Sequence, residues 1–399
     1  MTEATTRMTG ATAAAQPGPL DLLYGDTETE LRAAVRAVLA DKAAWPDVLA
    51  RTETTATYDS ELWHTLAADV GVAGLLIPES LGGAGASYRE AGVVAEEIGR
   101  AVGPVPFLGS AVVATTALLA VGDESLLSGL AVGAVTAALA VPFAAAPGRP
   151  GPLTVRLAGS QPGDEPGSYR LTGTVTGVAD ALPADVLLVP ADGVPAGLYV
   201  VDARAGTAAG GVVKAPVVSL DQTRQLCDLT LDNVPARQIA AGRAAEQAVT
   251  AALLAGAGVL ASEQLGIAER CLDMTVAYVK ERKQFARPIG GFQAIKHRLA
   301  DLWVMVTQAR AAARAGVDAL ANQHGTESEL LVALAKATCS DTALKAAQET
   351  IQLHGGIGFT WEHPAHLYLK RAKADSIGLG TADAHRASLA TLADLPGPT

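Results

Sequence analysis

The feature that most constrains the fold is a long helical apolar stripe in the last third of the chain. From Ile295 to Leu320, apolar residues recur at intervals of three and four. About 25 residues in this pattern predict roughly 38 Å of helix at ~1.5 Å per residue. Two further stretches, 247–281 and 327–353, have the same period. Long helices joined by short loops predict an antiparallel four-helix bundle, which we assign to residues 240–399.

The middle of the chain has the period of a strand. Residues 169–176 alternate apolar and polar side chains, as do 153–157 and 227–231, and short apolar runs occupy 186–189 and 198–201. Pro- and Gly-rich turns separate these stretches, without helices between them. The pattern predicts an antiparallel β-sheet or barrel, not a doubly wound nucleotide-binding fold, and we assign it to residues 134–239.

The first third of the chain is helical in pattern. Helical spacing covers 31–42 and 60–70, and Ser87 followed by Glu90 forms a capping box that begins a third helix. We assign a helical domain to residues 21–133. Residues 1–20, rich in Thr, Ala, Gly and Pro, are expected to be a disordered tail. The predicted fold is mostly α with a β domain, in the order helical domain, β domain, helical bundle.

Composition excludes several classes of protein. The net charge of −11 argues against a nucleic-acid surface, which needs clustered Lys and Arg. Cys227, Cys271 and Cys339 lie far apart, as is typical of reduced thiols in a cytoplasmic protein. The uncharged stretch at 127–148 is long enough to cross a membrane, but it is mostly Ala, Gly, Val and Thr and contains Pro142. We expect no membrane span there, but the end of a helix, a turn and a strand.

Several common catalytic patterns are missing from the sequence. No GxGxxG follows a predicted strand, and neither a P-loop nor a GxSxG elbow is present. The LGGAG at Leu81–Gly85 is interpreted as a loop. His363 and His366 are separated by Pro364 and have no nearby Cys partners, so we expect no metal site.

Two segments carry residues that a turn alone does not need. The first, Tyr278–Asp301, ends one long helix, turns through Pro288 and two glycines, and begins the next. Its Arg282 supplies a forked cation suited to phosphate, while Gln284 and Gln293 can donate and accept along a purine edge.

The second segment, Gln352–Phe359, reads QLHGGIGF. Its glycines Gly355 and Gly356 would let a ligand lie on the backbone, where N–H groups can meet a pyrophosphate. A helix end with a glycine turn would also explain this segment.

Together these segments closely resemble the acyl-CoA dehydrogenase family, over nearly the whole chain. The family signature is a long helix ending in ERxxF, a Pro-Ile-Gly turn and a Gln, followed some sixty residues later by QxxGGxG. The N-terminal stretch Leu62–Glu79, with Gly82 and Gly83, looks like the family's first-domain pattern. Ala95–Gly99, AEEIG, is similar to the stretch that follows it.

The resemblance implies a flavin site shared between subunits. Arg282 and Gln284 would bind the FAD pyrophosphate, with Phe285 against the cofactor. The adenosine half would be held by Gln293 and by Gln352 with Gly355 and Gly356. Thr381, in the stretch matching the family's YEGT, is a further cofactor-binding candidate. Such residues reach a flavin bound mostly by a neighbouring subunit, so the resemblance implies an oligomer. It also implies an acyl-CoA or other acyl thioester as substrate and an electron-transfer flavoprotein as electron acceptor. The helix at 292–323 fits the core of a tetramer, although a monomeric bundle would use the same stripe.

The chain departs from the family where the chemistry takes place. The family removes the α-proton of an acyl thioester with a carboxylate, often the Glu of YEGT. Here Gly378–Thr381 reads GLGT, so Leu379 occupies the place of the base. The alternative position on an earlier helix falls near Gly256. The TEPGAGSD-like stretch that contacts the flavin ring is replaced by residues 142–151, PFAAAPGRPG, with little hydrogen-bonding capacity.

Three functions fit this pattern. In a heteromeric dehydrogenase, as in the α2β2 members of the family's bacterial branches, this chain would lend the adenosine-side half-site to a partner with the base. In a self-sufficient homotetramer, the base would be Glu263, Asp375 or Asp383, each of which we otherwise expect to be a solvated surface charge. The third interpretation is a redox-neutral, flavin-free or structural member.

Overall fold

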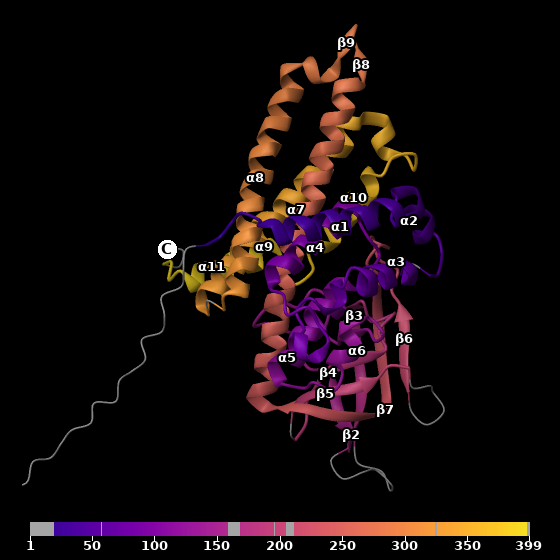
Figure 1. Cartoon of the computed structure of the whole chain (residues 1–399), viewed down its shortest axis with the longest axis vertical. Coiled ribbons are helices and arrows are strands. Elements are labelled where there is room, and N and C mark those ends of the chain that lie inside the picture. The colour runs from indigo at the N-terminus through magenta and orange to yellow at the C-terminus, as the bar shows by residue number, and fades with distance from the viewer. Residues whose placement is uncertain are drawn as a thin grey trace, which may run out of the picture.

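A computed structural model describes residues 20–56, 58–158, 168–194, 196–204, 211–323 and 325–396. Along these residues the predicted order of helical, β and helical parts is observed (Figure 1). The predicted tail at 1–20 lies outside the described residues except for Leu20. The boundaries placed at 133/134 and 239/240 stay predictions.

The N-terminal part is built from short helices around a central one, α4. The predicted capping box begins α4: the Ser87 hydroxyl accepts from Arg89 N at 3.1 Å, and Ser87 N donates to Glu90 Oε2 at 2.8 Å. A π-helical segment, Phe107–Ala114, leads into α5. The helices are α1 (Asp26–Lys42), α2 (Trp45–Thr52), α3 (Ser60–His64), α4 (Tyr88–Ala101), α5 (Thr115–Val121) and α6 (Leu127–Ala131).

The middle part is a curled sheet in the strand order β1-β4-β5-β7-β3-β2, with β6 also paired to β7. All strand pairs are antiparallel, as predicted, except β1 with β4 at one edge, which are parallel. The strand β2 meets the residue after β4 through an isolated bridge, Arg156 to Asp192, and not through a continuous ladder. The strands are β1 (Ala137–Leu139), β2 (Val155–Ala158), β3 (Ser168–Ala179), β4 (Val186–Ala191), β5 (Gly197–Asp202), β6 (Val212–Pro216) and β7 (Leu226–Ala241).

The C-terminal part contains the predicted long helices, with a two-stranded hairpin between the first two. The apolar stripe of α8 faces the bundle, where Leu302, Val306, Ala309 and Val317 are buried. The elements are α7 (Gly242–Glu281), β8 (Lys283–Gln284), β9 (Arg287–Pro288), α8 (Gln293–Ala321), α9 (Thr326–His354), α10 (Ala365–Asp375) and α11 (Ala382–Leu392).

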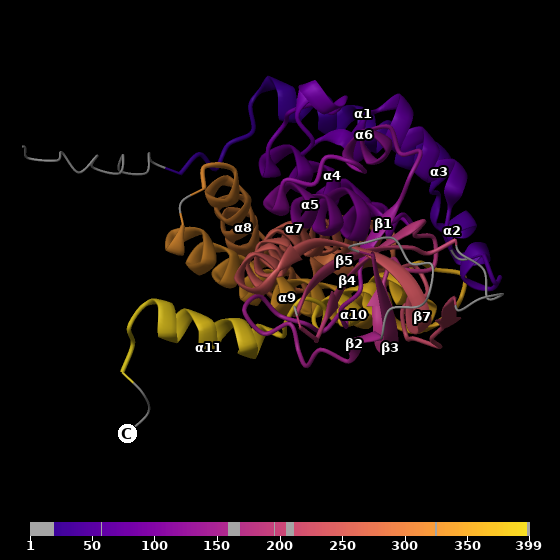
Figure 2. The same cartoon turned by 90° about the horizontal axis from the view of Figure 1, so that it is seen from below.

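The helix α7 lies between the other parts of the molecule. Seen from below, the N-terminal helices lie on one side of it and α9 to α11 on the other (Figure 2). Two glycines permit this packing, because a Cβ at Gly99 of α4 would clash with Glu263 O and a Cβ at Gly266 with Glu96 O. α7 is apolar and long enough to cross a membrane by composition alone, but 67% of its most apolar window is buried inside the protein. The stretch at 127–148 forms α6, a turn and β1, as expected from the sequence.

Candidate functional site

A short hairpin at the end of α7 carries the first predicted segment. Arg282 leaves the helix in an extended conformation, with its N–H donating to Tyr278 O at 2.9 Å. The turn between β8 and β9 is made by Phe285 and Ala286, which both have positive φ, 50° and 62°. Phe285 is 87% exposed, and its described ring contact is an edge-to-face approach to Phe292, with centroids 6.1 Å apart. The hairpin therefore presents an aromatic ring and a cation at the surface of the chain.

The second predicted segment follows the end of α9. The helix ends at His354, and the chain turns through Gly355, whose φ is 63°. A Cβ at Gly356 would meet nothing within 4 Å, whereas one at Gly358 would lie 2.8 Å from Ile351 O. Gly355 and Gly356 thus leave open backbone at the surface, as a ligand lying on the main chain requires. The open backbone is compatible with both interpretations that the sequence left, a ligand site and an ordinary glycine turn.

The structure brings the two segments together. The Tyr278 ring stacks on His354 with centroids 4.3 Å apart, and its hydroxyl donates to His354 O at 3.3 Å. A small apolar cluster of Val279, Ile289 and Leu353 joins the same elements. Gln293, the first residue of α8, follows the hairpin directly and is exposed. The ends of α7 and α9 and the start of α8 thus carry seven of the eight predicted cofactor residues: Arg282, Gln284, Phe285, Gln293, Gln352, Gly355 and Gly356. The β8–β9 hairpin marks this end of α7 in Figure 1.

Thr381 is separate from this end. Its hydroxyl caps α11, accepting from Ala384 N at 3.3 Å. The preceding Leu379 packs at Gly256 of α7, and Gly256 lies 26 residues before Arg282 on that helix. At ~1.5 Å per residue this is about 39 Å along α7. Thr381 therefore lies far from the hairpin end.

Leu379 and Gly256, the two positions where the family resemblance would place a catalytic base, contact each other. A Cβ at Gly256 would lie 3.0 Å from Leu379 Cδ1 and 2.8 Å from Val113 Cγ2. Leu379 is only 4% exposed and has φ of 53°. Its N–H donates to Phe143 O at 2.7 Å, and its carbonyl accepts from His385 Nε2 at 2.8 Å. Both positions are apolar, packed and without a proton acceptor in the side chain.

Phe143 also fills the space beside Leu379. It belongs to residues 142–151, the stretch that stands where the family resemblance places a motif in contact with the flavin ring. A Cβ at Gly378 would clash with the Phe143 ring, so the ring lies directly on the loop before Leu379. The guanidinium of Arg224 lies 5.4 Å from the same ring centroid. The cavity that remains beside Phe143 and Leu379 measures about 30 Å³. It has room for a water molecule or two and not for a flavin ring.

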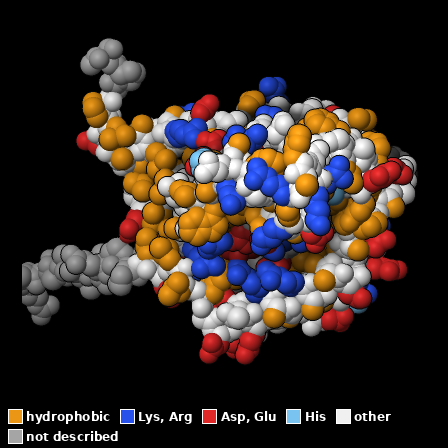
Figure 3. All heavy atoms as spheres, turned by 90° about the horizontal axis from the view of Figure 1, so that it is seen from above, with side chains coloured by type: hydrophobic (Ala, Val, Ile, Leu, Met, Phe, Trp, Pro, Cys, Tyr) orange, Lys and Arg blue, Asp and Glu red, His pale blue; other side chains and the backbone are white. Residues whose placement is uncertain are grey.

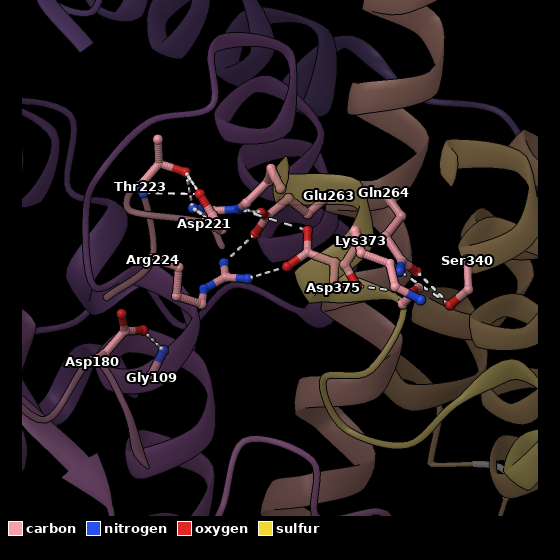
Figure 4. A network of polar contacts seen from close by, with 12 residues as sticks. Gly109, Asp180, Asp221, Thr223, Arg224, Glu263, Gln264, Ser340, Lys373 and Asp375 are labelled. Atoms are coloured by element: carbon pink, nitrogen blue, oxygen red, sulfur yellow. Dashed lines mark hydrogen bonds and ion pairs between the residues drawn. The ribbon is translucent and has the colours of Figure 1, made fainter. Parts of the chain in front are cut away.

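A buried ionic network contacts Phe143 through Arg224. The network joins the β domain to α7 and α10 (Figure 4). Arg224 donates to Glu263 at 2.6 Å and to Asp375 at 2.7 Å. Arg371 donates to Glu263 at 2.7 Å and to Thr223 Oγ1 at 2.9 Å. Two candidate bases, Glu263 and Asp375, are thus buried ion-pair partners, and the expectation that they are solvated surface charges was wrong. Asp383 is at the surface as expected, with its side chain 94% exposed beside Arg386.

The network shifts the pKa values of its carboxyl groups in opposite directions. Burial would raise the pKa of Glu263, but Arg224 and Arg371 outweigh it and hold that pKa well below the usual range. Burial and the neighbouring Glu263 raise the pKa of Asp375, whose Oδ2 has no hydrogen-bond partner among the described residues. Lys336, also buried, donates to Asp375 O at 2.9 Å and to Gly380 O at 3.3 Å. The network thereby fixes both sides of the Leu379 loop.

Asp180 is a buried carboxylate that the sequence analysis missed. It lines the small cavity beside Leu379, has φ of 57° and accepts from Gly109 N at 2.9 Å. Burial raises its pKa, although Arg224 and the Gly109 N–H lower it. Asp180 directly follows β3, and no spacing rule connects it with Leu379.

A groove runs beside α7. It measures about 910 Å³ and is lined from α4, α5, α7 and the α8–α9 connection, for example by Tyr88, Thr116 and Gln247. Thr250, Leu254 and Glu329 line both this groove and a hollow of about 260 Å³ beside α11.

The histidines behave as aromatic packing groups. His363 lies 4.2 Å from His354 between ring centroids, and His366 meets Trp361 edge-on at 4.6 Å. Burial lowers the pKa of both His363 and His366 to about 4. Within the ranges that the structure describes, no group of three or more His, Cys, Asp or Glu is placed to hold a metal ion.

Comparison with protein families gives two matches that together cover more than half of the chain. The model described as "Acyl-CoA dehydrogenase, N-terminal domain" matches residues 25–128. The model described as "Acyl-CoA dehydrogenase, C-terminal domain" matches residues 246–392.

Individual proteins match over most of their length. Acyl-CoA dehydrogenase IpdE2 of Mycolicibacterium smegmatis is 37% identical over 354 residues, 88% of this chain and 94% of that protein. A variant of the steroid ACAD Tcur3481–Tcur3483 superposes with a TM-score of 0.78 at 32% identity, over 92% of this chain and 98% of that one. The ChsE4–ChsE5 complex of Mycobacterium tuberculosis gives a TM-score of 0.82 at 27% identity, over 95% of this chain and 100% of that one.

Proposed function

The chain belongs to the acyl-CoA dehydrogenase family of FAD-dependent oxidoreductases, and from that premise we propose that it is one subunit of a two-component dehydrogenase. Its role is to supply the adenosine and pyrophosphate side of an FAD site whose ring pocket and base belong to a partner subunit. The reaction is the α,β-desaturation of an acyl-CoA or other acyl thioester. We expect an electron-transfer flavoprotein as acceptor and a cytoplasmic location, in keeping with three unpaired, buried cysteines.

The hairpin end fits the outer half of FAD. Arg282 is exposed and has no described ion-pair partner, so its guanidinium is free to donate a fork of hydrogen bonds to phosphate oxygens. The open backbone at Gly355 and Gly356 can approach a diphosphate closely. The exposed amides of Gln293 and Gln352 can donate and accept along a purine edge.

The observation that carries the proposal is the filled space around Phe143 and Leu379. Leu379 and Gly256 offer no proton acceptor, and Phe143 leaves a cavity of about 30 Å³. The residues present do not fit a flavin ring there. Because the hairpin end is open and the space at Leu379 is filled, the hairpin end is useful to a flavin framed by another chain.

FAD bound at the shared site would accept the hydride from the substrate β-carbon. The partner's carboxylate would take the α-proton, since this chain has no accessible one at Leu379. This chain's contribution is to bind and orient: Arg282 neutralises the diphosphate, and Phe285 covers the cofactor with its exposed ring. Both act in binding and positioning, not in proton transfer.

Two similar structures are described as pairs, ChsE4 with ChsE5 and Tcur3481 with Tcur3483. They support a partner of the same family for this chain. The exposed apolar side chains Trp303 and Val304 on α8, 59% and 47% exposed, support burial of that helix against another subunit.

Co-expression with a family member that retains the catalytic Glu tests the proposal. We expect a stable complex with one FAD per pair of chains, measured by native mass and flavin quantitation. The isolated chain, assayed alone, should show little dehydrogenation of acyl-CoA substrates. One flavin per chain in an active homo-oligomer would contradict the proposal.

The second candidate is a self-sufficient dehydrogenase, and Asp180 is the observation that favours it. It is the buried carboxylate that shares the small cavity with Leu379, and burial raises its pKa toward the range of a general base. This function requires Phe143 to move and open the cavity. An active homo-oligomer whose turnover is lost in Asp180→Asn but retained in Asp383→Asn would establish it.

A further inference from the structure

A hollow that takes no part in either half of the flavin site lies between α1, α2, α4, α7 and α10. It measures about 360 Å³, at the small end of the range typical of ligand pockets. Its lining includes three arginines, Arg36, Arg100 and Arg270, and two aromatic side chains, Trp45 and Tyr368. Figure 3, which views the molecule from above, shows basic and acidic side chains close together on this face.

Two of the three arginines are already neutralised. Arg36 is held by Glu97, with the closer nitrogen–oxygen distance 2.6 Å. Arg100 pairs with Glu269 at 3.2 Å and with Asp273 at 2.8 Å. These pairs fix the walls of the hollow and leave little free charge from either arginine.

Arg270 differs from them because it forms no ion pair with any described carboxylate. Glu97, which lines the hollow, pairs with Arg32 and Arg36, and Glu269, the residue before Arg270, pairs with Arg100 and Arg310. The polar neighbour of Arg270 is the hydroxyl of Tyr368, which itself donates to Arg100 O at 2.7 Å. The hollow therefore contains a cation whose charge no carboxylate of the described residues compensates.

The remaining walls are mostly apolar. Leu39 of α1 and Ala43, the residue that follows this helix, are buried beneath the hollow, and Trp45, the first residue of α2, is half-buried beside it. A single cation next to an indole and aliphatic side chains matches a ligand with one charged end and an apolar body.

We propose that this hollow binds a small molecule with one anionic group, a carboxylate or a phosphate, which pairs with Arg270 while its apolar part lies against Trp45 and Leu39. The proposal does not depend on how the flavin site is shared, because none of these residues takes part in either half of it. A ligand bound there would join α1 and α2 to α7 and α10, and so should raise the midpoint of thermal unfolding.

The test uses the full-length chain and three probes: inorganic phosphate, acetate and octanoate. Binding is measured by calorimetry and by the shift in unfolding midpoint. We expect one saturable site for phosphate or for octanoate, with affinity about tenfold or more weaker in Arg270→Gln, as expected for loss of a charge-assisted hydrogen bond. Octanoate binding more tightly than acetate identifies a carboxylate with an apolar tail, and phosphate binding alone identifies a phosphate site.

Matched variants separate the site from general charge effects. Arg204→Gln removes a solvent-exposed arginine on the β domain, with its side chain 64% exposed, and should leave the affinity unchanged. Arg270→Lys should retain part of the affinity, because it keeps the charge and loses the fork. Trp45→Phe should abolish any ligand-induced change in tryptophan fluorescence while the chain stays folded. Absence of saturable binding by all three probes, or equal affinity in a folded Arg270→Gln chain, would overturn the proposal.

Discussion

Replacing Arg282 by Ala should remove most of the flavin affinity of the two-component complex without unfolding this chain. The guanidinium is exposed and has no described ion-pair partner, so its loss should change the free energy of unfolding by no more than about 0.5 kcal/mol. The structural role of Arg282 is carried by its backbone, whose N–H donates to Tyr278 O and whose carbonyl accepts from Ile289 N at 2.8 Å. Alanine keeps both of these hydrogen bonds.

The expected loss of affinity follows from the type of bond. A charge-assisted hydrogen bond to phosphate typically contributes about 1.5–3 kcal/mol, which corresponds to roughly 10–150-fold in the dissociation constant. The assay is an equilibrium titration of the deflavinated complex with FAD, followed by flavin absorbance and fluorescence. Circular dichroism of the variant checks that the chain is folded.

Arg287→Ala is the matched control, because Arg287 lies on the other strand of the same hairpin. Its guanidinium stacks over Phe292, 4.0 Å from the ring centroid, and so is used within the chain. We expect a much smaller change in flavin affinity for Arg287→Ala than for Arg282→Ala. Unchanged affinity in a folded Arg282→Ala complex would refute the assignment of the pyrophosphate to Arg282. Equal losses in the two variants would mean that the hairpin acts only through its total charge.

Three further outcomes follow from the same contacts. Gln352→Ala should weaken FAD binding in the complex by less than Arg282→Ala, since a neutral hydrogen bond contributes only about 0.5–1.5 kcal/mol; the same titration measures it. Leu379→Glu in the isolated chain should not restore acyl-CoA dehydrogenation, because Phe143 still fills the space beside residue 379. The assay is reduction of an artificial electron acceptor, and brisk turnover would show that only the base was missing. Replacing His385 by Gln should reduce the dependence of the free energy of unfolding on pH in acid. Burial lowers the pKa of His385 to about 4, although its bond to the Leu379 carbonyl opposes this. Between about pH 6.5 and pH 4 the unfolded chain therefore binds the extra proton, and the free energy of unfolding falls as the pH falls. Denaturant titrations across this range should show a contribution of the order of 2–3 kcal/mol in the wild type that is absent from the variant.

The helices were predictable because their signals are local. The stripe that begins at Ile295 places an apolar residue on one face every three or four positions, and that face is the buried one in α8. Ser87 and Glu90 specify the start of α4 by bonds within four residues of each other. The turn between α7 and α8 was predictable for the same reason, since Arg282 to Gln293 is one continuous segment; its binding of a cofactor stays a prediction.

The parts that were missed depend on contacts between distant residues. The parallel pairing of β1 with β4 joins Ala137 to Val186, and no local pattern specifies it. Glu263 was expected at the surface because a carboxylate on a helix usually is, yet Arg224 and Arg371, far away in sequence, pair with it in the interior. The burial of Asp180 beside Leu379 likewise becomes visible only in three dimensions.

Two left-handed residues differ in how the energetic cost of their backbone conformation is offset. Leu379 and Phe285 both have φ near +50°, a conformation that costs a non-glycine residue roughly 1–2 kcal/mol. For Leu379 the cost is offset inside the chain, because its side chain is buried and both its N–H and its carbonyl are hydrogen-bonded. For Phe285 the side chain is 87% exposed, and an edge contact with Phe292 is the ring contact that the described residues provide. Strain that supports the chain's own core needs no partner. The cost of a strained backbone that presents an apolar ring to solvent is offset only when something covers the ring. An FAD framed by a second subunit would do so.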